Sequence, residues 1–344
     1  MKILIIGGTG TISTPLTRYL IERGEEITLY NRGLTQPEAP AGAKHIRGDR
    51  TNFAAFEAQM KEAGDFDYVI DMICFLSEEA ESAVRAFKGR TGHYIFCSTV
   101  DVYTKPAKFY PITEDHQRNP SSSFPYAFEK AKCENIFFEA YHRGDFLLSI
   151  IRPGATYREG GGPVHPFRGG TYNLDRLRRG KPIILHGDGN SIWSACHSED
   201  VARAFVGAIG NTKTYGNAYH VTGEEWMTWN YYWQSTAEVM GVSPPVIVHI
   251  PTDLLQRIAP KLSSWCVENF QHNNIFDNTA ARNDLGFRYS ITWKEGICRS
   301  LKWLDEHGGL ENSDNYPFYD RIIQAWEKLS GRMAQELKDI DRGI

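Results

Sequence analysis

A tyrosine and a lysine four positions apart are the residues best suited to do chemistry in this chain. Tyr126 and Lys130 stand in the segment YAFEK. On a helix this spacing places the phenol and the ammonium on one face. A tyrosine acts as an acid or base near neutral pH only if its pKa falls by roughly three units, which is about 4 kcal/mol. A neighbouring ammonium and a bound oxidised nicotinamide ring would supply much of the energy that lowers this pKa. An ordinary helical pair without any catalytic role has the same spacing.

A strand end with two hydroxyl residues precedes this pair. The run YIFCST predicts a buried strand that ends at Ser98 and Thr99. We expect the Thr99 hydroxyl to bind and orient a substrate oxygen. Asp101 follows two positions later, on the side of Thr99 if the segment stays extended. It is a candidate second acid or base or a contact to a sugar hydroxyl, and equally a residue that bonds to the backbone of its own loop.

The first strand leads directly into a bare turn. In ILIIGGTGTIS, Gly7, Gly10 and Ser13 follow the pattern G-x-x-G-x-x-S. A helix that begins there offers free N–H groups to an anionic pyrophosphate, provided that no side chain stands in the way. We therefore expect Gly7, Gly10, Thr11 and Ile12 to contact a dinucleotide.

The second strand should end at the adenosine ribose. EITLYNRG carries Asn31 and Arg32 there and no acid. A carboxylate would favour NAD, whereas an arginine can form a forked pair with the 2′-phosphate of NADP, so Arg32 favours NADP slightly. Alternatively, Arg32 is solvated or stacks on the adenine of NAD. After the third strand, Asp49 and Arg50 are further cofactor candidates, although an aspartate there can simply form the turn.

The elements around these residues predict an α/β fold. Continuous apolar runs alternate with amphipathic stretches up to Pro153, which favours a Rossmann-type, doubly wound parallel sheet. We assign residues 1–160 and returning segments at about 195–223 to this dinucleotide-binding domain. Residues 161–194 and 224–330 should form a smaller, mixed α/β substrate domain, and residues 331–344 a helical tail.

The composition narrows the class of partner. Hydrophobic residues make up 41% and charged residues 23% of the 344-residue chain, and the net charge of −4 argues against nucleic-acid binding.

The six cysteines lie far apart, as free thiols do in a reducing compartment. His and Cys never take metal-ligand spacing, and no apolar run is long enough for a membrane span. We expect a cytoplasmic protein without a metal, membrane or nucleic-acid partner.

Several motifs together make the chain similar to the extended short-chain dehydrogenase/reductase family, in particular its NAD-dependent epimerase/dehydratase branch. They are GGTGTIS, STVDVY, YAFEK, IIRPGATY, CHSEDVARAF, YHVTGEEWMTW and ARNDLGF. The resemblance implies a Rossmann domain with a smaller C-terminal substrate domain. It also implies that Thr99, Tyr126 and Lys130 are catalytic and that Pro153 lies along the nicotinamide. A homodimer formed through two helices per subunit is usual in this family.

Three departures from the family pattern bear on the substrate. Sugar 4,6-dehydratases have an Asp-Glu pair after the catalytic threonine, whereas this chain has Val100 and Asp101 and so lacks the first carboxylate. Ala155 replaces an asparagine that contacts a diphosphate in nucleotide-sugar enzymes. Trp193 stands where an arginine is common, although a register shift would bring in Arg168 or Arg203.

These departures favour a sugar without a nucleotide, or a polyol-like molecule, as substrate. Asp101, Tyr157 and Trp193 are the candidate substrate contacts. We expect an NAD(P)-dependent oxidoreductase or epimerase that acts on a hydroxyl or carbonyl carbon of such a molecule. The alternative is a non-catalytic, cofactor-binding regulatory protein on the same fold. Loss of Tyr126 or Lys130 would mark that alternative, and both are present.

Overall fold

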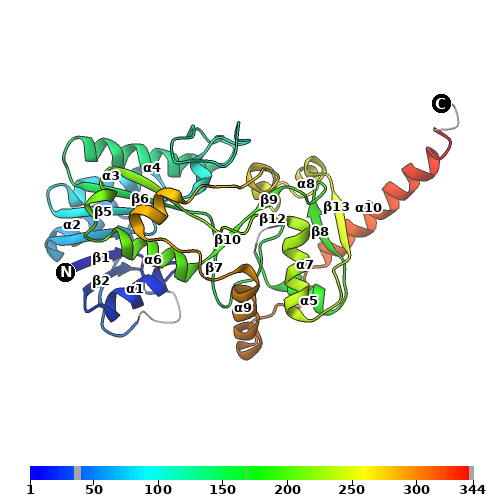
Figure 1. Ribbon diagram of the computed structural model, residues 1–344, viewed down its shortest axis with the longest axis horizontal. Helices are drawn as coiled ribbons and strands as arrows, with labels where there is room; N and C mark the ends of the chain where they lie inside the picture. Colours follow the sequence, from blue (N-terminus) through cyan, green and yellow to red (C-terminus); the bar gives the residue numbers. More distant parts are fainter. Residues whose placement is uncertain (35–39, 168, 341–344) are drawn as a thin grey trace. The chain divides into compact units, whose positions relative to one another are not determined.

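A parallel sheet organises the first half of the chain in the computed structural model, which describes residues 1–34, 40–167 and 169–340. Within these ranges the sheet has seven strands in the order β11-β6-β5-β4-β1-β2-β3 (Figure 1). All of its pairings are parallel. The strands are β1 (Lys2–Ile6), β2 (Glu26–Asn31), β3 (Lys44–Arg47), β4 (Phe66–Asp71), β5 (Thr91–Cys97), β6 (Leu147–Pro153) and β11 (Asn217–Val221). This confirms the predicted Rossmann-type fold.

Helices cover both faces of this sheet, because its strands are apolar on both sides. Ile3 and Ile5 of β1 belong to a core cluster with residues of α1 (Ser13–Glu22) and α6 (Ser198–Ala208). The alternate residues Leu4 and Ile6 belong to a second cluster. That cluster includes residues of α2 (Phe53–Ala63), α3 (Ser77–Phe87) and α4 (Pro125–His142). Successive side chains of a strand point to opposite faces, so one short run supports two apolar layers.

The chain divides into two compact units. The first comprises Met1–Arg158, Trp193–Trp226 and His272–Trp293. Besides the sheet and its helices it holds the paired strands β7 (Ala155–Tyr157) and β10 (Ala195–His197), and the short turns η1 (Val100–Val102), η2 (Thr212–Thr214) and η4 (Ala281–Leu285).

The segment 272–293 belongs to this first unit, although the sequence pattern suggested the substrate domain. Its backbone explains the difference. Ile112 donates its N–H to Ile275 and accepts from Asp277, at 2.8 and 2.9 Å. The Asn211 amide donates to the carbonyl of Asp284 at 2.6 Å. Such pairings between distant backbone segments leave no local signal in a sequence.

The second unit comprises Glu159–Ile192, Met227–Gln271 and Lys294–Ile344. Strands β8 (Ile183–His186) and β13 (Ile247–Ile250) pair in parallel within it. Its helices and turns are α5 (Tyr172–Arg178), α7 (Trp229–Met240), α8 (Thr252–Ile258), η3 (Cys266–Phe270), α9 (Trp293–His307), η5 (Ser313–Asn315) and α10 (Pro317–Glu336). Two short strands, β9 (Ile192–Trp193) and β12 (Met227–Thr228), lie at its boundaries. A core of Phe167, Ile184, Ile250 and Tyr319 holds this unit together.

An ion pair lies buried in the sheet core of the first unit. Arg50 Nη1 donates to both carboxylate oxygens of Asp71, at 2.7 and 2.8 Å, and its Nη2 donates to the Glu79 carbonyl. The Tyr94 hydroxyl donates to the same carboxylate at 2.6 Å. The hydrogen bonds to Asp71 join the loop after β3, which carries Arg50, to the end of β4. Arg50 is only 5% exposed. This placement corrects the expectation that Arg50 contacts a cofactor.

Among the described residues, no helix is long and apolar enough to cross a bilayer. Within the same residues, no group of three or more His, Cys, Asp or Glu side chains is placed to hold a metal ion.

Replacing Arg50 with methionine should lower the free energy of unfolding by about 3–5 kcal/mol, because the buried Asp71 carboxylate would lose its counter-charge. Urea denaturation measures the change. Lys44→Met is the matched control, because Lys44 pairs with Glu26 on the exposed surface and such pairs contribute about 0–1 kcal/mol. A folded Arg50→Met protein that binds nucleotide much more weakly than the wild type would instead support a cofactor role.

Candidate active site

The turn after β1 can exist only with glycine at two adjacent positions. Gly7 and Gly8 have φ values of 116° and 93°, a region that other residues avoid. A Cβ on Gly8 would lie 2.6 Å from Leu29 Cδ2. The sequence pattern pointed to Gly7 but not to Gly8. The doubled glycine was the signal that could have identified it.

The start of α1 fits an anionic group. Ser13 Oγ accepts the Gly10 N–H at 2.8 Å and so closes the turn at the first residue of the helix. Gly10 is exposed, and Thr11 and Ile12 are partly exposed beside it. The first turn of α1 carries no acidic residue. First-turn N–H groups have no partner within a helix, so the bare turn suits the pyrophosphate of a dinucleotide.

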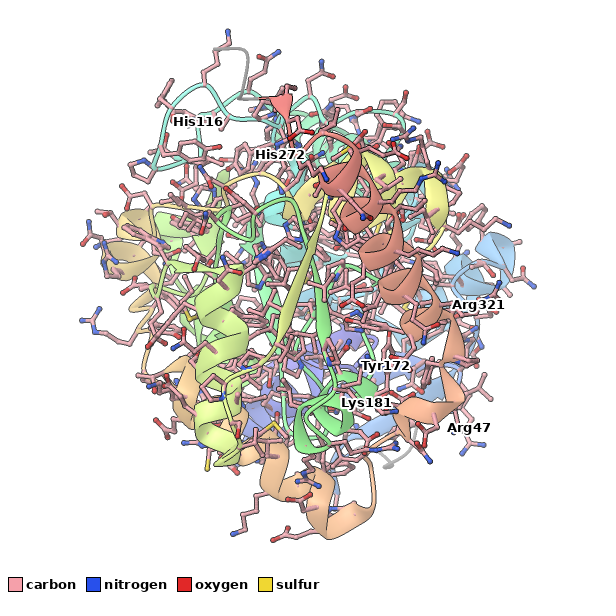
Figure 2. All side chains as sticks on the ribbon, turned by 90° about the vertical axis from the view of Figure 1, so that its right-hand side faces the viewer. Arg47, His116, Tyr172, Lys181, His272 and Arg321 are labelled. Carbon is pink, nitrogen blue, oxygen red and sulfur yellow. The ribbon has the colours of Figure 1, made fainter. Side chains whose placement is uncertain are left out.

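Two arginines lie where β2 and β3 end. The Asn31 side chain donates to the Gly7 carbonyl at 3.0 Å and accepts from Gly33 at 2.9 Å, so it braces the glycine turn. Arg32 is exposed beside it. Arg47, which is also exposed (Figure 2), pairs with Asn31 in the strand register. Its Nε lies 3.2 Å from where a Cβ on Gly33 would be. The sequence pattern missed Arg47 because only the pairing of β2 with β3 brings it to Arg32.

Asp49 adopts the turn alternative. Its carboxylate accepts from the Thr51 N–H at 3.0 Å and from the Thr51 hydroxyl at 2.8 Å. These hydrogen bonds, and to a smaller degree the charge of Arg32, hold the pKa of Asp49 below its ordinary value. The exposed carboxylate still lies at the end of β3, on the edge of the sheet that carries the glycine turn.

The structure brings Thr99 and Tyr126 together. Thr99 follows β5 and is buried, and Tyr126 is the second residue of α4 and is partly buried. The two hydroxyls are hydrogen-bonded. Lys130, one turn further along α4, is only 1% exposed. Its Nζ donates to the carbonyl of Cys74 at 2.9 Å and to that of Cys97 at 2.5 Å.

The pKa of Tyr126 differs from the expectation for an activated phenol. Its removal from water, and next the Asp101 carboxylate, raise the pKa above its ordinary value, while the hydrogen bond with Thr99 acts in the opposite direction. The Lys130 ammonium, one turn further along α4, donates to two backbone carbonyls. The protein alone therefore keeps Tyr126 protonated at neutral pH.

Asp101 lies in a tight turn and not in an extended segment. Residues Val100–Val102 form a 3₁₀ turn, and the Thr99 hydroxyl caps it by accepting from the Asp101 N–H. The turn nevertheless joins the two side chains, because Thr99 Oγ1 donates to Asp101 Oδ2 at 3.2 Å. On the other side, Lys105 Nζ donates to Asp101 Oδ1 at 3.0 Å. Lys105 was not singled out from the sequence, although its position four residues after an acid was a usable signal.

Of the other expected contacts, Pro153 ends β6 and is buried, with Val221 of β11 as its strand partner. Tyr157 ends β7, and its ring contacts Trp293 at a centroid distance of 5.0 Å. Trp193 is 4% exposed, which leaves little of its surface for a substrate.

Of the two arginines that a register shift would bring to the position of Trp193, Arg203 has other partners. Arg203 forms an ion pair with Asp200 and donates to Ser290. Arg168 lies outside the described residues.

A buried carboxylate fixes the helix that carries Tyr126. Glu134 of α4 accepts from Ser98 at 2.5 Å, from Arg152 of β6 at 2.9 and 2.8 Å, and from Arg118 at 2.5 Å. Burial by itself would raise the pKa of Glu134, but Arg152 and then Arg118 outweigh burial and hold the pKa below its ordinary value. One ionised side chain thus joins α4 to the ends of β5 and β6.

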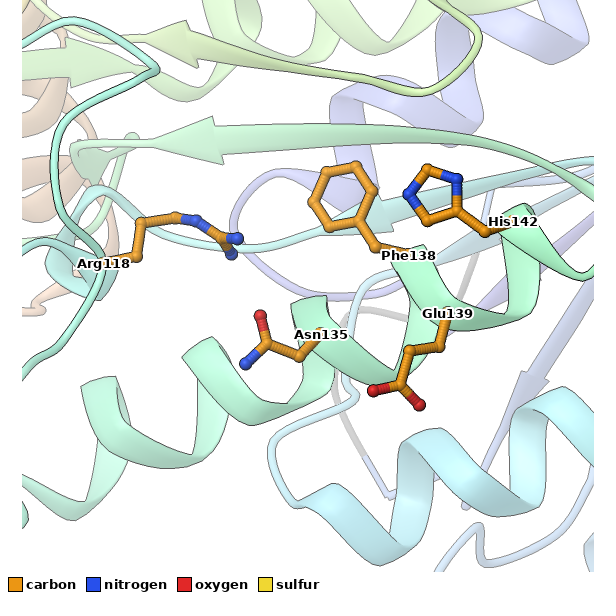
Figure 3. Close-up of a pocket in the computed structure, with 5 residues that line it drawn as sticks. All are labelled: Arg118, Asn135, Phe138, Glu139 and His142. Carbon is orange, nitrogen blue, oxygen red and sulfur yellow. The ribbon is translucent and has the colours of Figure 1, made fainter.

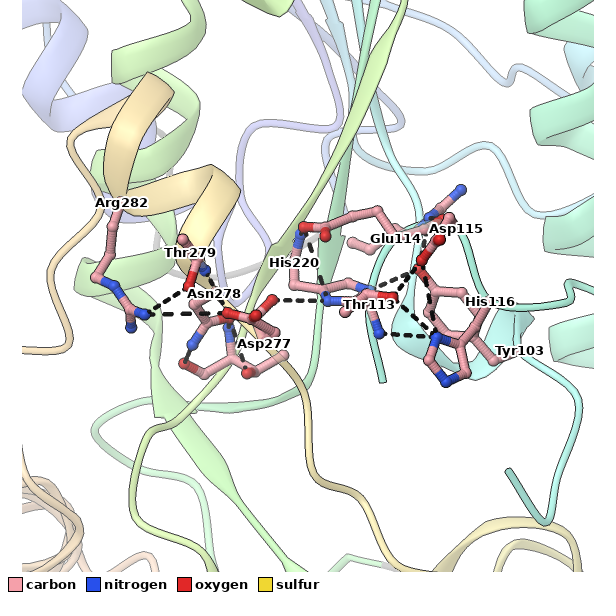
Figure 4. A network of polar contacts seen from close by, with 12 residues as sticks. Tyr103, Thr113, Glu114, Asp115, His116, His220, Asp277, Asn278, Thr279 and Arg282 are labelled. Carbon is pink, nitrogen blue, oxygen red and sulfur yellow. Dashed lines mark hydrogen bonds and ion pairs between the residues drawn. The ribbon is translucent and has the colours of Figure 1, made fainter. Parts of the chain in front are cut away.

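Further hydrogen bonds extend this network. Arg152 donates to the Tyr103 hydroxyl at 2.6 Å, and that hydroxyl lies 2.6 Å from His220 Nε2. His220 also bonds to Glu114 and to the carbonyl of Asp277 (Figure 4). The network therefore reaches from α4 to the segment 272–293.

Comparison with known proteins gives the family. A profile of the NAD-dependent epimerase/dehydratase family matches residues 3–221. The chain belongs to this family. It is 30% identical over 261 residues to the chloroplast stem-loop binding protein of 41 kDa b of Arabidopsis thaliana, covering 72% of this chain and 65% of that protein. It is 24% identical over 241 residues to 2′-dehydrokanamycin reductase of Streptomyces kanamyceticus, covering 70% and 67%. These matches span about two thirds of each relative's length.

Solved structures share the fold. The UDP-glucose 4-epimerase of Thermotoga maritima superposes with a TM-score of 0.70 at 18% identity, covering 89% of this chain and 99% of that one. A Bacillus cereus UDP-glucuronic acid 4-epimerase in complex with NAD superposes with a TM-score of 0.69 at 16% identity, covering 89% and 99%. These likenesses show the shared fold, and the matched family is described as NAD-dependent.

The glycine turn should tolerate no side chain. Gly8→Ala should lower the free energy of unfolding by about 1–2 kcal/mol or more, because it adds a strained φ and a clash with Leu29. It should also weaken nucleotide binding, which fluorescence titration measures. Gly331→Ala on α10 is the control, since its Cβ would meet nothing, and it should stabilise the helix by about 0.5–1 kcal/mol. Equal stability of the two variants would contradict the geometry of the turn.

Proposed function

We propose that this chain is an NAD(P)-dependent oxidoreductase or epimerase that acts on a hydroxyl or carbonyl carbon of a sugar or sugar-like molecule. The observation that carries the proposal is the hydrogen-bonded pair of Thr99 and Tyr126, with Lys130 anchored one turn away. This pair and the glycine turn both follow carboxyl ends of parallel strands in one sheet. In such sheets ligands bind along that edge.

Each of the three residues has a distinct task in this proposal. Thr99 orients the substrate oxygen, and Tyr126 gives a proton to that oxygen or takes one from it. Lys130 is held by the carbonyls of Cys74 and Cys97, so its charge sits at a fixed point where it can hold a nicotinamide ribose. A bound nicotinamide would supply the hydride acceptor or donor. Oxidation, reduction and epimerisation all use this apparatus.

The substrate class rests on departures from the nucleotide-sugar pattern. Ala155 and the buried Trp193 stand where that pattern has residues that contact a diphosphate. One relative, 2′-dehydrokanamycin reductase, is by its name a reductase of a dehydrogenated antibiotic. We therefore favour a sugar or polyol-like substrate without a nucleotide.

The second candidate function is binding without catalysis. The name of the Arabidopsis relative, a stem-loop binding protein, is the observation that favours it. The sequence RLRRGK, residues 176–181 at the end of α5, is basic and could bind a nucleic-acid backbone. It does not support this second candidate, because its cations are paired with acidic side chains. Arg176 pairs with Asp320, Arg178 with Asp305, and Lys181, which is labelled in Figure 2, with Asp314.

We also propose that the protein forms a homodimer through two helices per subunit, one of them α4, as the family resemblance implies. The outer side of α4 carries a hollow of about 410 Å³ lined by Asn135, Phe138, Glu139, His142 and Arg118 (Figure 3). Tyr126 is not among the described residues that line this hollow.

Tyr126→Phe should lower the turnover number by about 10²- to 10⁴-fold and leave nucleotide binding unchanged, because only the transferable proton is lost. Sugars, amino sugars and polyols, together with their keto forms, would be screened with both nucleotides by the absorbance of reduced nicotinamide. Tyr141→Phe on the same helix should keep full turnover. A Tyr126→Phe protein with undiminished turnover would overturn the proposed mechanism. Stem-loop binding without any turnover by the wild type would favour the second candidate.

Arg32→Glu should weaken binding of NADP by about 10- to 100-fold and leave binding of NAD nearly unchanged, because one charged hydrogen-bond donor to the 2′-phosphate is lost. Calorimetric titration of both nucleotides measures the ratio. Arg18→Glu is the control, since Arg18 is an exposed residue of α1 that pairs with Glu199. Equal weakening of NAD and NADP would mean that Arg32 does not read the phosphate.

A further inference from the structure

We propose that Asp101, with Lys105 as its fixed counter-charge, is the proton acceptor and donor for Tyr126, connected to it through the Thr99 hydroxyl. This inference rests on the proposed function, because Tyr126 must be the acid/base residue. It adds a route for the proton that the motif of Thr99, Tyr126 and Lys130 does not include.

The first observation is a continuous line of contacts within the first unit. The Tyr126 hydroxyl is hydrogen-bonded to Thr99. Thr99 Oγ1 donates to Asp101 Oδ2 at 3.2 Å. Asp101 Oδ1 accepts from Lys105 Nζ at 3.0 Å, and Lys105 also donates to Asn274 Oδ1 at 2.9 Å. A proton can pass along the hydrogen bond between Tyr126 and Thr99 and along the one between Thr99 and Asp101, and Lys105 lies within hydrogen-bonding distance of that carboxylate.

The second observation is the burial of this charge pair. The side chains of Asp101 and Lys105 are 8% and 7% exposed, and Asn274 is 3% exposed. A buried carboxylate is costly unless a cation pairs with it. The pair is therefore fixed in place, with the Asp101 carboxylate joined to Thr99 on one side and to Lys105 on the other. A surface pair with the same spacing would be mobile and screened by water.

Because Tyr126 stays protonated, it needs a nearby group that accepts its proton. Burial, and after it Asp101 and Cys97, act to raise the pKa of Tyr126, and the hydrogen bond with Thr99 acts to lower it. Lys130 lies on the same helix, but its ammonium is committed to the carbonyls of Cys74 and Cys97. A phenol that stays protonated can accept the proton of an alcohol only if its own proton leaves at the same time. Thr99 is the neighbour through which that proton reaches a carboxylate.

The proton step is balanced as follows. When an alcohol is oxidised, its hydroxyl proton passes to the Tyr126 oxygen, the phenol proton passes to Thr99 Oγ1, and the Thr99 proton passes to Asp101 Oδ2. A bound nicotinamide would supply the acceptor for the hydride that leaves the carbon. The products are a carbonyl compound and a neutral Asp101, which later releases its proton to water. In carbonyl reduction each transfer runs in reverse.

The first test measures the ionisation of Tyr126 directly and needs no substrate. Protein labelled with ¹³C at tyrosine Cζ would be titrated by NMR, and the Tyr126 signal among 17 tyrosines would be assigned by its loss in Tyr126→Phe. Asp101→Asn should lower the pKa of Tyr126 by about one unit, because a nearby negative charge is removed. Lys105→Met should raise it, because the carboxylate then loses its counter-charge.

The control for this test is Asp115→Asn, which removes an exposed carboxylate of the same loop that bonds to Thr113. It should leave the titration of Tyr126 unchanged. If Asp101→Asn does not fold, Lys105→Met provides an independent measurement. A Tyr126 pKa that responds to neither Asp101→Asn nor Lys105→Met would overturn the proposal.

The second test separates a relay from a simple electric field. Thr99→Val removes the hydroxyl that joins Tyr126 to Asp101 and leaves both charges in place. If protons pass through Thr99, then Asp101→Asn should shift the Tyr126 pKa less than half as much in the Thr99→Val protein as in the wild type. An equal shift in both backgrounds would overturn the relay and leave only a field effect.

A third measurement follows turnover with the alcohol or ketone found in the substrate screen. A relay that moves several protons together gives a curved dependence of rate on the deuterium content of the water. That dependence should become linear in Asp101→Asn, and linearity already in the wild type would contradict the relay. Absence of turnover in every screen would count against the proposed function. The NMR titration would still decide whether Asp101 controls Tyr126.

Discussion

The positions of the candidate active-site residues at the carboxyl ends of the strands depend on one buried ion pair between α4 and β6. Glu134 and Arg152 lie in the interior, with two hydrogen bonds between them at 2.9 and 2.8 Å. Taking both charges out of water is costly, and their attraction offsets this cost only with good geometry and further hydrogen bonds. Ser98 and Arg118 supply those hydrogen bonds to the carboxylate. The pair thus determines where α4 sits on the sheet more than it adds stability.

This constraint sets the positions of the reactive groups. Lys130 lies one helical turn before Glu134, and Tyr126 lies one turn before Lys130, so fixing Glu134 fixes the whole face. The same carboxylate accepts from Ser98, the neighbour of Thr99. The helix and the strand end are therefore positioned by a shared partner. That arrangement explains how a phenol and a hydroxyl from separate elements meet within hydrogen-bonding distance.

Periodicity and motif spacing predicted much of this architecture. Apolar runs after the bare glycine turn indicated a parallel sheet, because strands buried on both faces need continuous hydrophobic sequence. The order of Thr99, Tyr126 and Lys130 along that pattern indicated residues that the fold brings to one edge. Local residue types carry this information, so a sequence can reveal it.

Partners distant in sequence could not be read in this way. Arg50 looked like a cofactor contact because it follows a strand, yet inside the core it pairs with Asp71, whose carboxylate also accepts from Tyr94. The segment 272–293 looked like part of the substrate domain, yet Ile112 pairs with it through the backbone. In both cases the deciding interaction is long-range, and neither residue type nor spacing encodes it.

The charge arrangement around Tyr126 also bears on the direction of the reaction. A phenol kept protonated by burial and by Asp101 is ready to give a proton to a carbonyl oxygen, which is the step that reduction requires. Oxidation instead requires Tyr126 to accept a proton from the alcohol, so it depends on a carboxylate that can take the phenol proton away. Lys105 donates a hydrogen bond to that carboxylate, whose other oxygen accepts from Thr99. In the proposed mechanism, this pair of opposite charges beside Thr99 and Tyr126 lets a neutral tyrosine serve both directions, which an epimerase would need in a single catalytic cycle.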